Sequence, residues 1–404
     1  MKVVDSLLLV KFTVGDLPII LSSWPRPFNF VEEEEQMFVS SANPLTELKD
    51  GQVYSFNIPS MYCYSLFFTH DGTGYSLVLL SPYPFAFFFT TILNYVYNEF
   101  QKDDTPLEPL SRLSYLATII KSIPDNINSS ITVHFPFWDY ETNITPDSFT
   151  YKDYDPTDYF TDEQCNEIWL SLFTNTPILF IAEDITSAND AVFSALSLLS
   201  PLQFCDEVCV WLTETDPRFV SIINGDSNIK IAATSCVYLG EATSFFKNVI
   251  QVPKRHPRSS EIREELQKKT KQIITMTNYE LDHMVLAKDP YFEDTKQELD
   301  KQKLQKSLDY YKKFNLPCAD DFVKWENSNT FKKWREIRPS KDPFREGLLN
   351  CDRKLLLQKK SKEELEVISK VIDEYRKKYK KDEHVMAVLR MHKREVKKLL
   401  NEKN

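Results

Sequence analysis

Glycine is scarce in this chain, which has 7 Gly against 22 Pro in 404 residues. Few glycines leave few positions for left-handed turns and for loops that wrap closely around a phosphate group. The two common glycine-rich nucleotide fingerprints, GxGxxG and GxxxxGK[ST], are both absent from the sequence. The chain therefore lacks the usual sequence signs of binding a nucleotide by itself.

Long apolar runs are also lacking. No run reaches the roughly 20 residues that a membrane span requires, and the nearest, Tyr75–Val96, is interrupted by Pro82 and Pro84. Residues Met1–Val10 have neither the charge pattern nor the small-residue cleavage site of a signal peptide. We therefore expect a cytoplasmic protein whose contact with membranes is at most peripheral.

The sequence contains cysteines, but their spacing does not match that of metal ligands. The 7 Cys are scattered, and the closest pair, Cys205 and Cys209, has no second Cys pair or His pair at zinc-ligand spacing. The acidic segment 139–162 lacks the glycine and closing glutamate of an EF-hand calcium loop. We expect reduced, buried, unreactive thiols and neither a metal nor another cofactor.

Charge is distributed unevenly along the chain. Residues 1–250 contain 11 Lys and Arg against 32 Asp and Glu, whereas residues 251–404 contain 38 against 27. An acidic first part repels nucleic acid and anionic lipid, and a basic second part attracts either of them or the first part itself. The simplest interpretation of the basic part is a set of solvated helix faces. Because its Lys and Glu alternate without exposed aromatic residues, we do not expect nucleic-acid binding.

The first 137 residues predict a sheet covered by helices. Two hairpins are indicated, one turning at Gly15-Asp16 and one turning within His70–Gly74. Glu32–Glu35 reads as an acidic loop or the start of a helix. The predicted strands are Ser6–Val14, Leu17–Trp24, Tyr62–Thr69, Tyr75–Leu80 and Ile131–Phe135, and the helices are Phe85–Phe100 and Ser111–Ser122. An acidic linker without periodicity is expected at 138–162.

Helices and short apolar strands alternate from residue 163 to 252, which predicts an α/β module with a mostly parallel sheet. The predicted helices are Asp162–Phe173, Ser187–Leu199 (capped by Ser187 or Asn189) and Glu241–Asn248, and the strands are Pro177–Ala182, Val208–Leu212 and Ile229–Ala233. Residues 253–404 read as an all-α module. Its predicted helices are Glu261–Tyr279, Lys296–Lys313, Asp320–Ile337 and one long helix, Lys362–Leu400.

Three segments resemble DENN-domain proteins in the order expected for that family. S-A-L-S-L-L-S-P-L at 194–202, followed by Asp216–Phe219, resembles the central DENN module. Y-S-L-V-L-L-S-P-Y-P-F at 75–85 resembles the longin-like first module, and Asn329–Arg338 is similar to a pattern in the tail of the DENND6 (FAM116) subfamily. The chain departs from the family at Ala232–Cys236, where relatives carry an Asn-Pro pair.

The resemblance implies a guanine-nucleotide exchange factor for a Rab-type GTPase that acts in membrane trafficking and is recruited to endosomal membranes. Such a protein needs a wide binding surface rather than a catalytic triad or a cofactor. Loops at the strand ends of the central module are the places where we expect the GTPase to bind. The candidate residues there are Glu183, Asp184, Ser187, Pro201, Gln203, Phe204, Asp216, Arg218 and Phe219.

Other interpretations stay open at this point. Glu183 and Asp184 also fit a helix cap, Pro201 the end of a helix, and Phe204 and Phe219 a core. A GTPase-activating protein would need an arginine finger, yet no Arg lies between Arg26 and Arg112, which leaves Arg218 as the other nearby candidate. A non-catalytic adaptor that binds through the terminal helix is a further alternative. A hydrolase or transferase is less favoured, because His134 and His256 have no evident nucleophile–acid partners.

Overall fold

The computed structural model describes residues 3–13, 17–43, 48–102, 107–123, 130–135, 139–143, 154–242, 244–256, 258, 260–286, 290–291, 317–337 and 343–403. Its contacts divide the chain into two compact units. The first comprises Met1–Thr270 and Asp321–Trp334, and the second comprises Lys271–Asp320 and Arg335–Asn404. The chain is mixed α/β in the first unit, and the elements described in the second unit are helical.

The first unit begins with a five-stranded antiparallel sheet in the order β2-β1-β5-β4-β3. Its strands are β1 (Ser6–Phe12), β2 (Ile19–Trp24), β3 (Val53–Ile58), β4 (Met61–His70) and β5 (Thr73–Ser81). The two predicted hairpins are thus confirmed as β1–β2 and β4–β5, and β3 is an additional strand. The turn at Gly15-Asp16 lies outside the described residues.

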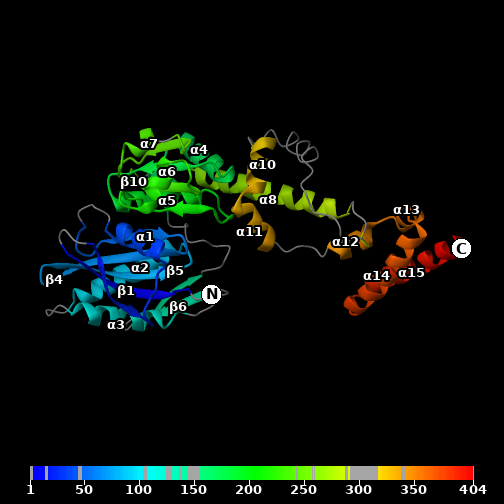
Figure 1. Ribbon diagram of the computed structural model, residues 1–404, viewed down its shortest axis with the longest axis horizontal. Helices are drawn as coiled ribbons and strands as arrows, with labels where there is room; N and C mark the ends of the chain where they lie inside the picture. The colour runs from blue at the N-terminus through cyan, green and yellow to red at the C-terminus, as the bar shows by residue number, and fades with distance from the viewer. Residues whose placement is uncertain are drawn as a thin grey trace. The chain divides into compact units, whose positions relative to one another are not determined.

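Helices cover both faces of this sheet, shown in blue and cyan in Figure 1. They are α1 (Glu32–Ala42), α2 (Ala86–Phe100) and α3 (Pro109–Ile120). Tyr64 of β4 contacts Phe89 of α2 on one face, and Phe56 of β3 contacts Phe38 of α1. Phe56 is paired with Cys63, the neighbour of Tyr64, so alternation along the strands places α1 on the opposite face.

The second sheet has four parallel strands in the order β11-β8-β10-β9, with helices packed around it (Figure 1). The strands are β8 (Ile178–Ile181), β9 (Glu207–Cys209), β10 (Ile229–Thr234) and β11 (Asn248–Gln251), and the helices are α4 (Asp162–Phe173), α5 (Ile185–Ser197), α6 (Pro217–Ile223) and α7 (Leu239–Ala242). The predicted parallel α/β arrangement is confirmed. A helix over Glu241–Asn248 was a wrong prediction, because α7 ends at Ala242 and the β-branched Val249 and Ile250 continue into β11 beside β8.

The predicted acidic linker contains regular structure. β6 (Ser130–His134) pairs with β7 (Asp139–Asn143), and a short 3₁₀ helix, η1, spans Pro156–Asp158. Arg255 pairs with the buried Asp158 at 2.6 Å, and the Thr157 hydroxyl donates to the carbonyl of Arg258. Asp158 and Thr157 therefore hold Arg255 and Arg258 against η1.

Residues 319–337 form two helices, α10 (Ala319–Asn327) and α11 (Asn329–Ile337), so the single helix predicted over Asp320–Ile337 is wrong. The helical conformation is interrupted at Ser328, whose hydroxyl accepts from the backbone N–H of Phe331. Within the first unit, Trp325 stacks on Phe173 of α4 with ring centroids 4.9 Å apart. The preceding helix α8 spans Ile262–Leu286, and its Thr270 accepts a hydrogen bond from the Trp169 indole.

The second unit contains a helical hairpin, with α14 (Lys362–Lys378) and α15 (Glu383–Glu402) preceded by α12 (Pro343–Asn350) and α13 (Arg353–Gln358). One continuous helix over Lys362–Leu400 was predicted wrongly, because Asp382 caps a new helix after the turn at 379–382. An apolar core lies between the two helices, with Ile368, Ile372 and Leu389 fully buried. The helix expected at Lys296–Lys313 lies outside the described residues.

Candidate functional site

The two sheets of the first unit are joined through asparagine side chains at β3. The Asn57 amide donates to the carbonyl of Val208 at 2.5 Å and accepts from the N–H of Val210 at 2.8 Å. Asn189 of α5 bonds in the same two-sided way to the backbone N–H and C=O of Ser55. Each amide thus satisfies backbone groups that a neighbouring strand would otherwise pair. The edge of the first sheet is in this way joined to the central module.

The loop after β8 carries the first group of predicted residues. Asp184 is the N-cap of α5 and accepts from the backbone N–H groups of Thr186 and Ser187 at 2.8 and 2.9 Å. Ser187 donates its hydroxyl to the same carboxylate, and Glu183 is exposed. The helix therefore starts at Ile185, two residues before the predicted start, and the predicted caps Ser187 and Asn189 have other roles. Of this group, Glu183 offers the most freely accessible side chain.

The segment after β9 carries the second group, and it is buried. Asp216 caps α6 and forms an ion pair with Arg218 at 2.6 Å, with the two side chains 0% and 5% exposed. Ser41 of α1 donates to the same carboxylate at 3.2 Å, and Phe219 belongs to the core of the central module. Asp216 and Arg218 therefore hold α6 against α1, Phe219 packs into the core of the central module, and none of the three lines an exposed surface.

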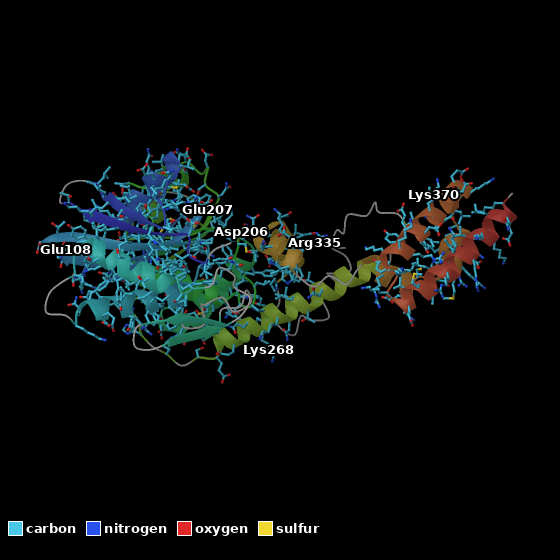
Figure 2. All side chains as sticks on the ribbon, turned by 90° about the horizontal axis from the view of Figure 1, so that it is seen from below. Glu108, Asp206, Glu207, Lys268, Arg335 and Lys370 are labelled. Atoms are coloured by element: carbon cyan, nitrogen blue, oxygen red, sulfur yellow. The ribbon has the colours of Figure 1, made fainter. Side chains whose placement is uncertain are left out.

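The third group lies on the opposite side of the parallel sheet, where the amino ends of the strands are. Pro201, Gln203 and Phe204 precede β9, whereas the first two groups follow the carboxyl ends of β8 and β9. Phe204 is buried, and Pro201 and Gln203 are half-buried. Asp206 and Glu207, two and three residues after Phe204, are labelled in Figure 2, and Asp206 accepts from the N–H groups at the start of α11. The structure thus brings the first two groups to one edge and separates the third.

Exposed apolar side chains that the sequence patterns did not single out lie beside the second group. Val220 and Ile223 of α6 are 58% and 42% exposed, and Val237 and Tyr238, between β10 and α7, are 59% and 50% exposed. The rings of Phe219 and Tyr238 are 6.4 Å apart and bring the two segments together. We call these four exposed side chains the α6 surface. The i, i+3 spacing of Val220 and Ile223 was the available signal, but the short α6 had not been predicted.

The α6 surface lies at the carboxyl edge of the parallel strands, where open α/β sheets commonly bind ligands. Hydrogen bonds to the side chains of Cys236 and Glu214 raise the pKa of Tyr238. Glu214 is itself exposed. The surface therefore combines apolar area with an acidic neighbour and a hydroxyl group, which suits binding of a protein partner.

The thiols of the first unit are poor nucleophiles. Cys63, Cys165, Cys209 and Cys236 are buried, and burial raises the pKa of Cys209 to about 12 and that of Cys165 to about 12. Cys205 is half-buried, and burial raises its pKa to about 11. In the second unit Cys318 is exposed, which corrects the expectation that all seven thiols are buried. A thiol with a raised pKa carries little of the reactive thiolate at neutral pH.

Within the described residues, no group of three or more His, Cys, Asp and Glu side chains is placed to hold a metal ion. His256 uses its backbone N–H to bond the carbonyl of Asp158, and the side chain of His134 is outside the described residues. No described helix combines the length and the apolar character needed to cross a bilayer.

Comparison with known proteins gives no assignment. No protein-family model matches the chain, and no curated protein matches it with significance.

Proposed function

We propose that the chain is a guanine-nucleotide exchange factor for a Rab-type small GTPase, with a longin-like module over residues 1–137 and a central DENN module over residues 163–252. The α6 surface carries this proposal, because it presents exposed apolar side chains at the carboxyl edge of the parallel sheet, on a helix that packs against α1 of the other module. The resemblance of Tyr75–Phe85 and of 194–202 to DENN proteins supports the choice of partner. An endosomal site of action belongs to the same proposal.

The mechanism needs no bond-making group. A GTPase holds its nucleotide with Mg²⁺ and with switch segments that are ordered by the bound phosphates. A protein that binds those segments in a shape incompatible with Mg²⁺ and nucleotide lowers nucleotide affinity, and by linkage the nucleotide lowers the affinity of that protein in return. The hydrogen-bonded junction at Asn57 and Asn189 keeps the α6 surface and α1 in a fixed relation within the first unit. A rigid surface loses little conformational entropy on binding.

The alternative of a GTPase-activating protein requires an accessible arginine finger, for which Arg218 was the candidate. Arg218 is 5% exposed and is bound to Asp216, so its guanidinium does not reach a partner in this structure. Arg112 is also buried, with its guanidinium over the rings of Phe68 and Phe100. A finger must contact the phosphates of the GTPase to stabilise transition-state charge. The exchange-factor proposal has no such requirement.

The test is an exchange assay on the full chain with a panel of Rab-type GTPases loaded with a fluorescent GDP. We expect faster GDP release for at least one GTPase, and loss of that acceleration in a Val220→Glu, Tyr238→Ala variant. Leu110→Glu is the matched control, because Leu110 on α3 is 58% exposed, as Val220 is, and lies away from the α6 surface in the chain fold. Circular dichroism establishes that all variants are folded.

Three results would decide against the proposal. Faster GTP hydrolysis without faster GDP release would indicate an activating protein. Binding of a GTPase with no change in either rate would indicate an adaptor. Equal loss in the Leu110→Glu control would mean that the α6 surface is not the contact.

A further inference from the structure

Four lysines are concentrated at the turn that joins α14 and α15 in the second unit. Lys377, Lys378, Lys380 and Lys381 are all exposed and lie within five consecutive positions. We call these four lysines the basic turn. Lysine ammonium groups packed this closely repel one another, so such a cluster favours binding of an anionic surface.

Carboxylates flank the basic turn on both sides along the chain, at Glu374 before it and at Asp382 and Glu383 after it. In the described part of the chain, no ion pair joins Lys377, Lys380 or Lys381 to a carboxylate. Asp382 comes directly after the turn, but its carboxylate accepts from the Val385 N–H at 3.1 Å and from Arg345 at 2.9 Å. Its charge is thus already shared with a helix start and with a guanidinium.

The aromatic residues beside the turn are not a platform for nucleic-acid bases. The Lys378 ammonium lies over the rings of Tyr379 and Tyr375, 5.0 and 5.7 Å from their centroids. Both tyrosines are half-buried in the helical hairpin. Single-stranded nucleic acid is usually held by base stacking on freely accessible rings. The turn therefore offers concentrated charge without base-stacking surface.

The exposed face of α15 extends the positive potential. Arg390 and Arg394 are exposed at i, i+4 spacing, so they share one side of the helix, whereas Lys398, one turn further, is paired with Glu402 at 3.8 Å. Met391, on the neighbouring position, is 45% exposed. A charged surface of this size attracts an extended anionic partner over a Debye length of about 8 Å at physiological salt.

We propose that the basic turn binds the surface of an anionic lipid membrane. Four or more clustered lysines near a helix are the sequence feature that anionic lipid surfaces attract, and each contributes separately. The lysine side chains are long and flexible, which suits a fluid array of phosphate and carboxylate head groups better than a fixed site. The proposal does not depend on the α6 surface or on any GTPase, so the two proposals are tested separately.

The experiment is co-sedimentation of the full chain with phosphatidylcholine vesicles that contain or lack phosphatidylserine. We expect binding only with phosphatidylserine and weaker binding at high salt. In a variant with Lys377, Lys378, Lys380 and Lys381 each changed to Gln, the vesicle affinity should fall by roughly 100-fold or more, since each lysine contributes about a fivefold factor.

The matched control removes the same number of charges elsewhere in the second unit. Lys354, Lys359, Lys362 and Lys370 are exposed, and Lys370 is labelled on α14 in Figure 2. Their change to Gln should alter vesicle affinity by less than about fivefold, because charges away from the membrane surface are screened. Equal loss of vesicle affinity in the two variants would overturn the proposal. Failure of the unchanged chain to bind phosphatidylserine vesicles would overturn it as well, and binding to RNA instead would identify the basic turn as a nucleic-acid contact. Far-UV circular dichroism of each variant excludes unfolding as the cause.

Discussion

At the scale of single residues, the junction between the two sheets depends on side-chain amides. Asn57 supplies both a donor and an acceptor to backbone groups of the β9 segment, and Asn189 does the same for β3. A side-chain amide offers a donor and an acceptor in one plane without carrying charge. Neither residue had been predicted to have this role, because a hydrogen bond between positions more than 130 apart leaves no local pattern.

Arg218 gives a prediction at the same scale. Replacing Arg218 by Ala leaves the buried Asp216 carboxylate without its charged partner, which should lower the free energy of unfolding of the first unit by about 3–5 kcal/mol. Urea denaturation followed by tryptophan fluorescence measures the loss. The double change Asp216→Asn, Arg218→Met is the control, and it should cost clearly less because no unpaired charge remains. An Arg218→Ala protein of unchanged stability would contradict the structural role assigned here.

At the scale of elements, the sequence predicted most helices and strands of the first unit. It did not predict the elements that form only through contacts with distant segments of the chain. The helix Asp162–Phe173 was predicted with its observed bounds, and in the structure its start is fixed locally by a capping box of Thr161 and Gln164. β11 was missed because its four residues form a strand only through pairing with β8. The burial of Asp216 and Arg218 likewise follows from contact with Ser41 of the other module, which no local pattern records, whereas a core position for Phe204 was one of the open interpretations.

The break between α10 and α11 shows the same limit and gives a prediction. Ser328 caps α11 locally through the N–H of Phe331, and Asp206, more than 120 positions away, adds a second cap by accepting from the N–H groups of Asn329 and Thr330. Replacing Asp206 by Ala should destabilise the start of α11 by about 1–2 kcal/mol. Hydrogen exchange of residues 329–334 should become faster by a corresponding factor. The neighbouring Glu207→Ala is the control, and equal acceleration in it would contradict the capping role.

At the scale of the whole molecule, acid should destabilise the second unit through the buried His392. In the second unit, His392 is 2% exposed and its Nδ1 is hydrogen-bonded to the hydroxyl of Tyr291. Burial, together with the positive charge of Arg353, lowers the pKa of His392 to about 4. A histidine in an unfolded chain has a pKa of about 6.5, so it binds a proton at mildly acidic pH that the folded unit does not.

The lower pKa of His392 in the folded unit than in the unfolded chain fixes the sign of the pH dependence of stability. Stability from His392 is fully present above about pH 6.5 and is lost as the pH falls toward about 4, with a total of about 3 kcal/mol. Near pH 5 the free energy of opening α14 and α15 should therefore be lower by about 2 kcal/mol than near pH 7. Hydrogen exchange of these helices, corrected for the intrinsic effect of pH, measures the change. His392→Gln should remove most of this dependence, whereas His384→Gln, an exposed position on the same helix, should keep it. An unchanged pH dependence in His392→Gln would assign the effect to other groups, because glutamine cannot take up the proton.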